Sequence, residues 1–189
     1  MTAVFLPQQG STTIEPATTA DSNPEHLAAA ADKVANHHNS AIYIKVQMQD
    51  FSQQVLYQQL AATPYCGAVV TFTGLVRDHP ELQLQALELE HYPGMTEKAL
   101  QQIATEAAQR FELKAISIIH RVGLLTEREQ IVFVGVASAH RSSAFAGAEF
   151  IMDYLKTRAP IWKKQHDSQG SAWVEAKASD TVQQQRWQP

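Results

Sequence analysis

The stretch "KAISIIHRVGLLTEREQIVFVGVAS", residues 114–138, decides the fold, because it holds two strands that follow each other along the chain. The runs 114–123 and 130–138 are rich in β-branched residues, and each has the length of a strand rather than of a helix. Residues 124–129 between them are expected to form a loop. A long helix is predicted over about 141–157. Adjacent strands followed by a helix favour an α+β fold over a doubly wound parallel sheet.

The segments around this pair alternate between strand and helix patterns. Helices are predicted over 50–61, with Asp50 as the N-cap, and over 94–111. Pro160 ends the third helix near Thr157. Together these patterns predict a largely antiparallel sheet with two long helices. The other strands are predicted at 41–47, 66–74, 84–92 and 172–177. A few helical turns are predicted at the C-terminus, over 180–187.

The first 40 residues differ in composition from the rest of the chain. They are rich in Thr, Ser, Gln, Pro and Ala, with few large apolar side chains. The apolar surface that they could bury is too small to offset the conformational entropy lost on folding. We therefore predict a disordered extension without chemistry over 1–40, in which a short helix at 23–36 is possible. The functional domain is predicted over 41–189.

Composition narrows the class of protein. Hydrophobic residues make up 44% of the chain, and the net charge of −4 argues against binding nucleic acid over the whole surface. Cys66 is the only cysteine, so no intramolecular disulfide can form, and we expect a buried, inert thiol. No apolar run approaches the ~20 residues of a membrane helix, and the start lacks the basic segment of a signal peptide. A cytoplasmic location is expected.

Positive charge is concentrated in one segment of this acidic chain. Between His140 and Lys164 lie five Lys or Arg residues and two acidic ones, and the segment includes "DYLKTRAPIWKKQ" at 153–165. A solvated basic face is the ordinary interpretation. Three observations favour an anion site: His140 and Arg141 at a helix start, Pro160 and Trp162 among the cations, and Arg77 after a strand and a glycine. Weak RNA binding is a poorer alternative, because the remainder is acidic.

The positions of these cations predict a dimer. Arg141 and Lys156 lie at opposite ends of one predicted helix, about 22 Å apart at ~1.5 Å per residue. A metabolite about 10 Å long cannot contact both. A two-fold homodimer can place the helix start of one copy beside the helix end of the other, and it forms the same composite pocket twice.

Four blocks of the sequence resemble a known family. They are "GAVVTFTGLVRDH" (67–79), "LELEHYPGMTEKAL" (87–100), "HRVGLLTEREQIVFVGVASAHRSSAF" (120–145) and "FIMDYLKTRAPIWKK" (150–164). Together, in order and spacing, they are similar to the large, catalytic subunit of molybdopterin synthase over residues 41–187. The resemblance implies an α+β, α/β-hammerhead fold and a central homodimer. It also implies that each copy binds a small ubiquitin-like sulfur-carrier subunit, giving a heterotetramer.

The reaction that the resemblance implies is a sulfur transfer. The carrier's C-terminal Gly-Gly tail, as a thiocarboxylate, enters the pocket of the large subunit. Two sulfurs pass to cyclic pyranopterin monophosphate and form the dithiolene of molybdopterin, in molybdenum cofactor biosynthesis. A cationic pocket suits a phosphorylated substrate and an anionic donor. No cofactor, metal, nucleic acid or membrane is implied.

The same motifs imply roles for individual residues. Lys156 and Lys163 match the catalytic lysines; Lys156 would act as a general acid or base, or attack the carrier's carbonyl, and Lys163 would position phosphate or the tail carboxyl. Arg77 and Arg141 suit phosphate through forked hydrogen bonds, and His140 would orient substrate or shuttle a proton. The substrate-binding set is Arg77, His140, Arg141, Lys164 and Gln165.

One position departs from the family. Gln165 stands where the family commonly has glutamate, so we expect no proton transfer there, while a hydrogen bond to substrate stays possible. The competing function is a non-catalytic dimeric module that docks a ubiquitin-like tail or a phosphate ligand. The joint presence of Arg77, His140, Arg141, Lys156 and Lys163 favours the enzyme.

Several other side chains have open or ordinary interpretations. The scattered histidines lack metal-ligand spacing, so no zinc site is predicted. Phe72 and Phe145 are expected to pack, and Met95 is expected in the core of its helix rather than at the pocket. Trp162 suits a pocket wall and core packing equally. Structural and pocket-edge interpretations are about even for Glu90, His91 and Tyr92.

Overall fold

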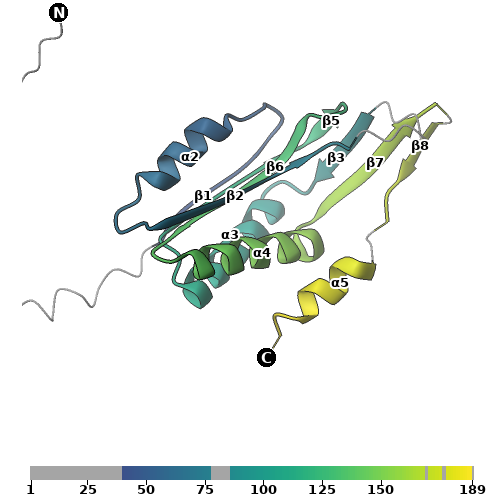
Figure 1. The fold of residues 1–189 in the computed structure, drawn as a ribbon. Coiled ribbons are helices and arrows are strands. Elements are labelled where there is room, and N and C mark those ends of the chain that lie inside the picture. The colour runs from purple at the N-terminus through teal and green to yellow at the C-terminus, as the bar shows by residue number, and fades with distance from the viewer. Residues whose placement is uncertain (1–39, 78–85, 169, 176–177, 189) are drawn as a thin grey trace, which may run out of the picture. The chain divides into compact units, whose positions relative to one another are not determined.

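The computed structural model describes residues 40–77, 86–168, 170–175 and 178–188, all within one compact unit, His37–Pro189 (Figure 1). The predicted extension over 1–40 and its possible helix lie outside the described residues, apart from Ser40. They therefore stay predictions. Residues 78–85, which include His79 and the start of the predicted strand 84–92, also lie outside.

The first sheet contains the two strands of the deciding stretch. Its order is β1 (Ala41–Gln47), β4 (Ala115–Arg121), β6 (Gln130–Ser138) and β2 (Ala68–Leu75). β4 and β6 pair antiparallel, with Ile118 opposite Val134, and only the β1–β4 pair of this sheet is parallel. Every residue of β4 is buried, which fits a continuous apolar run in a central strand. These pairings confirm the α+β, largely antiparallel prediction.

A second sheet extends beyond the first. Its order is β5 (Gly123–Leu125), β3 (Ala86–His91), β7 (Ile161–Asp167) and β8 (Gly170–Trp173), and all its pairs are antiparallel. The sequence predicted one sheet, placed Leu124 and Leu125 of β5 in the loop 124–129 and missed β7. β8 is also shorter and earlier than the predicted strand 172–177. Because β7 reads "IWKKQHD", it lacks the apolar alternation by which strands are recognised.

Three helices match the predicted segments. They are α2 (Gln53–Ala61), α3 (Met95–Phe111) and α4 (Arg141–Arg158), and α5 (Ala178–Gln185) falls near the predicted C-terminal turns. The prediction of Asp50 as N-cap is wrong. Ser52 caps α2, its hydroxyl accepting the Val55 N–H at 3.3 Å, while Asp50 accepts the N–H of Phe51. Among the described residues, no helix has both the length and the apolar character to cross a membrane.

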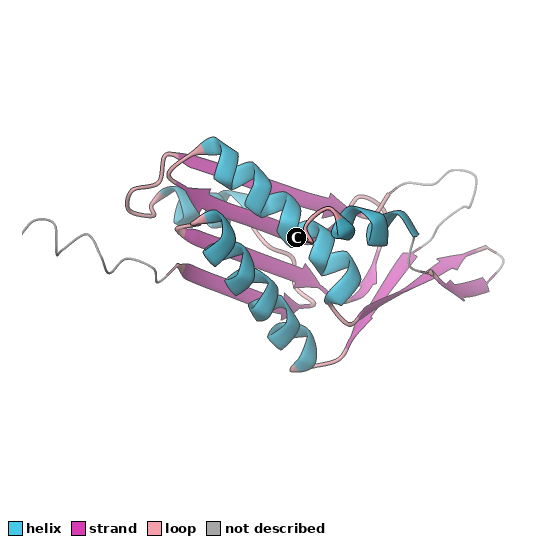
Figure 2. Cartoon of the chain, turned by 90° about the horizontal axis from the view of Figure 1, so that it is seen from below, coloured by secondary structure: helices cyan, strands magenta, loops and turns pink. Residues whose placement is uncertain are grey.

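The helices cover the first sheet on both sides. α3 and α4 lie side by side on one face, and α2 lies on the other (Figures 1 and 2). Between α3, α4 and the sheet lies the main core. Its largest fully buried side chains include Phe150, Ile151, Leu100, Ile103, Ile116, Ile118, Val134 and Val136.

Some residues expected in the interior are exposed in the single chain. Phe72 is 42% exposed, Phe145 64% and Met95 58%, so the predictions that they pack inside are wrong for the chain alone. Cys66 is only partly buried, and its thiol donates to the carbonyl of Ala68 at 3.4 Å.

A buried carboxylate ties the C-terminus to α4. Asp153 is 5% exposed, and its Oδ2 accepts from Nη2 of Arg186 at 2.7 Å and from Nε1 of Trp187 at 2.7 Å. The Trp187 ring lies edge-on to Phe111 and Phe150. These contacts hold the end of the chain, and with it α5, against α3 and α4.

We expect Asp153→Asn to lower the free energy of unfolding by about 1–3 kcal/mol, because a buried acceptor of charged hydrogen bonds becomes a neutral amide. Glu149→Gln is the matched control: Glu149 pairs with the same Arg186 at 2.7 Å but is 56% exposed, so its loss costs about 0–1 kcal/mol. Urea unfolding of the two variants measures the difference. Equal losses would contradict the role of the buried carboxylate.

Candidate functional site

The C-terminal end of α4 carries Lys156 and Arg158, and each has a specific partner. Lys156 is partly exposed, and its Nζ lies 3.4 Å from Oδ1 of Asp180 on α5. Arg158 pairs with Glu106 of α3 at 3.0 Å and stacks over the Tyr154 ring at 3.8 Å. The Lys156–Asp180 contact depends on the packing of α5 against α4. The sequence analysis predicted helical turns in this region but not how they pack.

β7 then separates the residues that follow along the chain. Opposite residues of an antiparallel pair share a face of the sheet, and successive residues alternate. Lys163 lies opposite Leu89 and Gln165 opposite Leu87, so both belong to the face that carries the buried Leu87 and Leu89. Lys164 lies opposite Glu88, on the other face.

The contacts of Lys164 agree with this register. Its Nζ is 4.0 Å from a carboxylate oxygen of Glu88 and 5.5 Å from the centre of the Trp173 ring. His166 lies on the same face and contacts Glu88 at 2.8 Å. The structure therefore brings Lys163 and Gln165 together and points Lys164 away from them.

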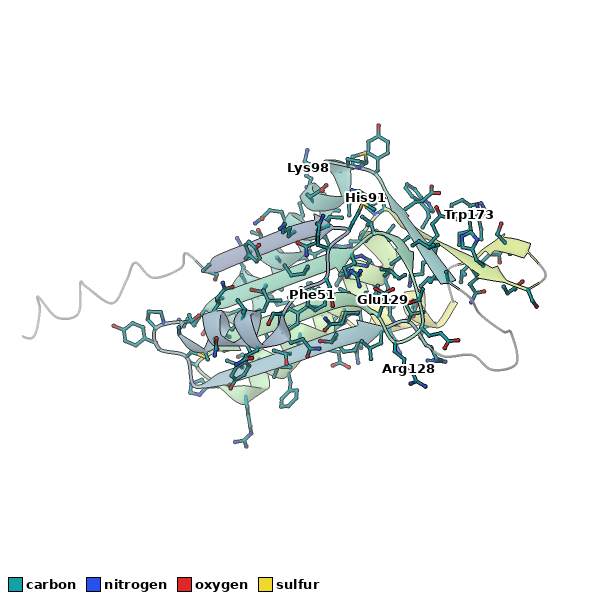
Figure 3. All side chains as sticks on the ribbon, turned by 90° about the horizontal axis from the view of Figure 1, so that it is seen from above. Phe51, His91, Lys98, Arg128, Glu129 and Trp173 are labelled. Atoms are coloured by element: carbon teal, nitrogen blue, oxygen red, sulfur yellow. The ribbon has the colours of Figure 1, made fainter. Side chains whose placement is uncertain are left out.

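The same register bears on two open interpretations. Trp162 is 48% exposed and lies opposite Glu90, on the Lys164 face, so it is neither in the core nor beside Lys163. His91 lies opposite Ile161 on the Lys163 face, and its Nε2 is 3.9 Å from Glu97. Of the Glu90–His91–Tyr92 run, His91 is the residue placed on the Lys163 face; Figure 3 shows it at the end of its strand.

A buried histidine next to this face was missed by the sequence analysis. His120 is 3% exposed, and its Nδ1–H donates to the carbonyl of Arg121 at 2.8 Å. Burial lowers the pKa of His120 to about 4, the hydrogen bond to Arg121 opposes this shift, and the charges of Lys163 and His91 lower the pKa further. His120 is thus a neutral imidazole whose pKa is lowered in part by the charge of Lys163. Its place in an apolar strand gave no sequence signal.

Arg77 follows β2 and has a second arginine beside its backbone. The N–H of Val76 donates to the carbonyl of Glu129, and the N–H of Arg128 donates to the carbonyl of Val76, both at 2.9 Å. Arg77 is exposed, and Figure 3 shows Arg128 and Glu129 near each other. Arg128 has φ 66°, a left-handed conformation uncommon for a side chain of its size.

His140 and Arg141 lie at the start of α4, and both are exposed. The preceding loop is fixed by Gly67, whose N–H donates to the carbonyl of Ser138 at 2.9 Å. A Cβ at Gly67 would lie 2.4 Å from the carbonyl oxygen of Ala139, so only glycine allows this approach. The helix start is therefore firmly placed, with its free N–H groups near these two side chains.

Within one chain the predicted residues do not all lie together. β2 pairs with β6 so that Ala68 lies opposite Ser138, near His140, while Leu75 lies opposite Gln130, near Arg77. From Ala68 to Arg77 an extended chain covers about 30 Å. α4 is continuous over 18 residues and separates Arg141 from Lys156 by about 22 Å. His140 and Arg141 thus lie far from Arg77 and from Lys156.

A cavity of about 240 Å³ lies elsewhere, between α2, β1 and β4. Its lining includes Ile42, Leu60 and Ile116, and all seven predicted site residues, each of which is described, lie outside it. This cavity is therefore not the predicted site.

Because His120 is neutral when folded and binds a proton at pH about 6.5 when unfolded, the unfolded chain takes up the proton first as the pH falls. We expect the free energy of unfolding to drop by about 3 kcal/mol more between pH 6.5 and pH 4 than in His120→Asn. The asparagine amide can still donate near the position of Nδ1 but does not titrate. Urea unfolding of the unmodified chain and of His120→Asn across this pH range measures the difference. If the free energy of unfolding changed with pH in parallel in the two proteins, His120 would not be the neutral, buried group described above.

Comparison with known proteins gives a consistent identity. The family model described as MoaE protein matches residues 46–158. Molybdopterin synthase catalytic subunits are 54% identical over 145 residues in both Yersinia pestis and Escherichia coli, covering 76% of this chain and 96–97% of theirs. The MoaE protein structure from Burkholderia ambifaria is 46% identical, has a TM-score of 0.67 and covers 77% of this chain and 97% of its own. The chain therefore belongs to the MoaE family of molybdopterin synthase catalytic subunits.

Proposed function

We propose that this chain transfers two sulfurs from the thiocarboxylated C-terminus of a small ubiquitin-like carrier to cyclic pyranopterin monophosphate, at a pocket completed by a second copy. One observation carries the proposal. Lys156 and Lys163 flank the connection between α4 and β7, while the start of α4, the proposed anion site, lies about 22 Å away. The two halves of the site are therefore present but separate.

Lys156 is the proposed group for the chemistry at the carrier's carbonyl. To attack a carbonyl carbon it must first lose a proton, and the ion pair with the Asp180 carboxylate at 3.4 Å opposes that loss. As an ammonium, Lys156 instead donates to oxygen or sulfur that gains negative charge. The ion pair with Asp180 requires α5 to stay packed, which the Asp153 contacts ensure.

The remaining residues bind the anionic parts. The planar guanidinium groups of Arg77 and Arg141 match phosphate oxygens in pairs. Lys163 contributes a point charge, and Gln165 on the same face of β7 offers an amide for hydrogen bonds. Lys164 lies on the opposite face of β7 from Lys163. Lys164 could therefore contact substrate only at a different surface from the one that Lys163 lines.

Exposed apolar side chains support the proposal that a second copy completes the pocket. Phe145 follows Arg141 by four residues, so both lie on the same side of α4, and Phe145 is 64% exposed. Phe72 and Leu75 on the edge strand β2 are 42% and 51% exposed. Covering these side chains with the same surface of another copy would bury them and bring a second Arg141 to the pocket.

The carrier and the location complete the proposal. The relatives are named as catalytic subunits, which implies a further subunit, and the motif resemblance identifies it as the thiocarboxylated carrier. Two copies of each chain give a heterotetramer. We place this assembly in the cytoplasm, consistent with the absence of a disulfide-forming pair of cysteines in the sequence.

We expect Lys156→Ala to slow product formation by about 10²–10⁴-fold, the range for loss of an acid–base group. We expect Lys163→Ala to slow it by about 10²–10³-fold, the range for loss of one donor that stabilises developing charge. The assay combines the purified chain, thiocarboxylated carrier and cyclic pyranopterin monophosphate, with the product followed by mass. Lys164→Ala is the matched comparison, because its side chain leaves the opposite face of the same strand. Near-normal rates for Lys156→Ala would refute the assignment, and a Lys164→Ala loss as large as that of Lys163→Ala would refute the division by face.

Mixing subunits tests the shared pocket. Arg141→Ala and Lys156→Ala chains should each be inactive as homodimers, whereas a mixed dimer has one pocket with both residues intact. About half of mixed-dimer sites then regain activity, because each isologous pocket takes one residue from each copy. Activity that stays at the level of the separate variants after confirmed subunit exchange would show that each pocket lies within one chain.

A further inference from the structure

The connection between α4 and β7 is a tight turn at Pro160. The N–H of Ile161 donates to the carbonyl of Ala159 at 2.8 Å, which closes the turn around the proline. Lys156 lies four residues before Pro160, and Lys163 lies three residues after it. The geometry of this turn therefore sets the direction in which β7 leaves α4, and with it the position of Lys163 relative to Lys156.

A buried threonine of α3 holds this turn. Thr96 is 0% exposed, and its hydroxyl donates to the carbonyl of Pro160 at 3.1 Å. The same oxygen accepts the N–H of Tyr92 at 3.3 Å. One hydroxyl thus joins the residue after β3 to the residue before β7.

The sheet register explains why a hydroxyl is needed there. The last pair of the β3–β7 ladder is His91 opposite Ile161, so the next pair would be Tyr92 opposite Pro160. Proline has no N–H and cannot complete a ladder pair. The Thr96 hydroxyl satisfies the two groups that remain, the Tyr92 N–H and the Pro160 carbonyl, and anchors both strand ends to the start of α3.

The start of α3 is itself fixed. Gly94 precedes the helix with φ 80°, a conformation that favours glycine, and its N–H donates to the Glu97 carboxylate at 2.7 Å. The N–H of Thr96 donates to the carbonyl of Tyr92 at 3.0 Å. Thr96 therefore has little freedom to follow a movement of the turn, so the turn is held to it.

We propose that Thr96 is a positioning residue for sulfur transfer, whose hydroxyl fixes the α4–β7 turn and so sets the relative placement of Lys156 and Lys163. The inference rests on the proposed assignment of those two lysines. Thr96 itself is buried and touches no substrate. Its effect passes through the turn, and a displacement of about 1 Å between reacting groups can cost a hundredfold in rate.

The test compares Thr96→Val with Thr96→Ser in the full chain, using the thiocarboxylated carrier and cyclic pyranopterin monophosphate. Valine keeps the shape and removes the hydroxyl, and serine keeps the hydroxyl. We expect Thr96→Val to lower kcat about tenfold to a hundredfold with little change in KM, and Thr96→Ser to stay within about threefold of the unmodified chain. Equal losses in both variants, or none in Thr96→Val, would overturn the proposal.

Two further measurements separate positioning from a general loss of stability. Ile103→Val is the matched control: it lies on the same helix, is 1% exposed, and lowers the melting temperature without touching the turn. A kcat loss in Ile103→Val equal to that of Thr96→Val at matched stability would overturn the proposal. Amide exchange at Tyr92 should be slow in the unmodified chain and in Thr96→Ser, and fast in Thr96→Val; unchanged exchange in Thr96→Val would also overturn it.

The lysine variants keep this inference distinct from the proposed function. If Lys156→Ala and Lys163→Ala are inactive while Thr96→Val is normal, the positioning role fails and the function stands. If the lysine variants are active, the assignment on which the inference rests fails, and the inference fails with it. Should Thr96→Val not fold, the serine variant and the exchange of the Tyr92 amide in the unmodified chain still decide the question.

Discussion

The length of α4 is the constraint on which the rest of this structure depends. A helix has a fixed rise, so 18 residues place its two ends at a separation that no side chain can close. Arg141 and Lys156 can act on one small substrate only if different copies of the chain supply them. In the proposed dimer the second copy supplies the missing residue, and the exposed side of α4 near Phe145 would then matter as much as its buried side.

The buried side of α4 gives the helix its stiffness. Phe150, Ile151 and Tyr154 lie in the core, and Asp153 uses the same side to hold the C-terminal Arg186 and Trp187. α5 is thereby placed where Asp180 meets Lys156. The contacts of Asp153 thus help to place Asp180 beside Lys156, the proposed catalytic residue one turn further along α4. The same helix therefore carries a contact that stabilises the fold and a residue proposed for the chemistry.

The strength of the local pattern decided how much of the fold could be predicted from sequence. β4 and β6 are apolar and β-branched, α3 and α4 have clear boundaries at Gly94 and Pro160, and all four were located within a residue or two. β7 was missed because its strand character comes from pairing with β3 and β8, not from its own residues. Asp50 was predicted as the cap because its residue type suits the position, but Ser52 suits it equally, and only the backbone shows where the helix begins.

The candidate site shows the same division between local and long-range information. The motif places Lys163 and Lys164 next to each other and both in the site, but the register with β3 sends one toward Leu89 and the other toward Glu88. Asp180, His120 and Thr96 reach the lysines or the turn between them from elements distant in sequence, so no local pattern marks them. Chemistry-bearing residues can be read from a motif, but their orientation depends on strand register and helix packing, which are properties of the whole chain. The two lysines are therefore best understood as a product of the β3–β7 register and the Pro160 turn together, since a change in either would keep both residues and lose their arrangement.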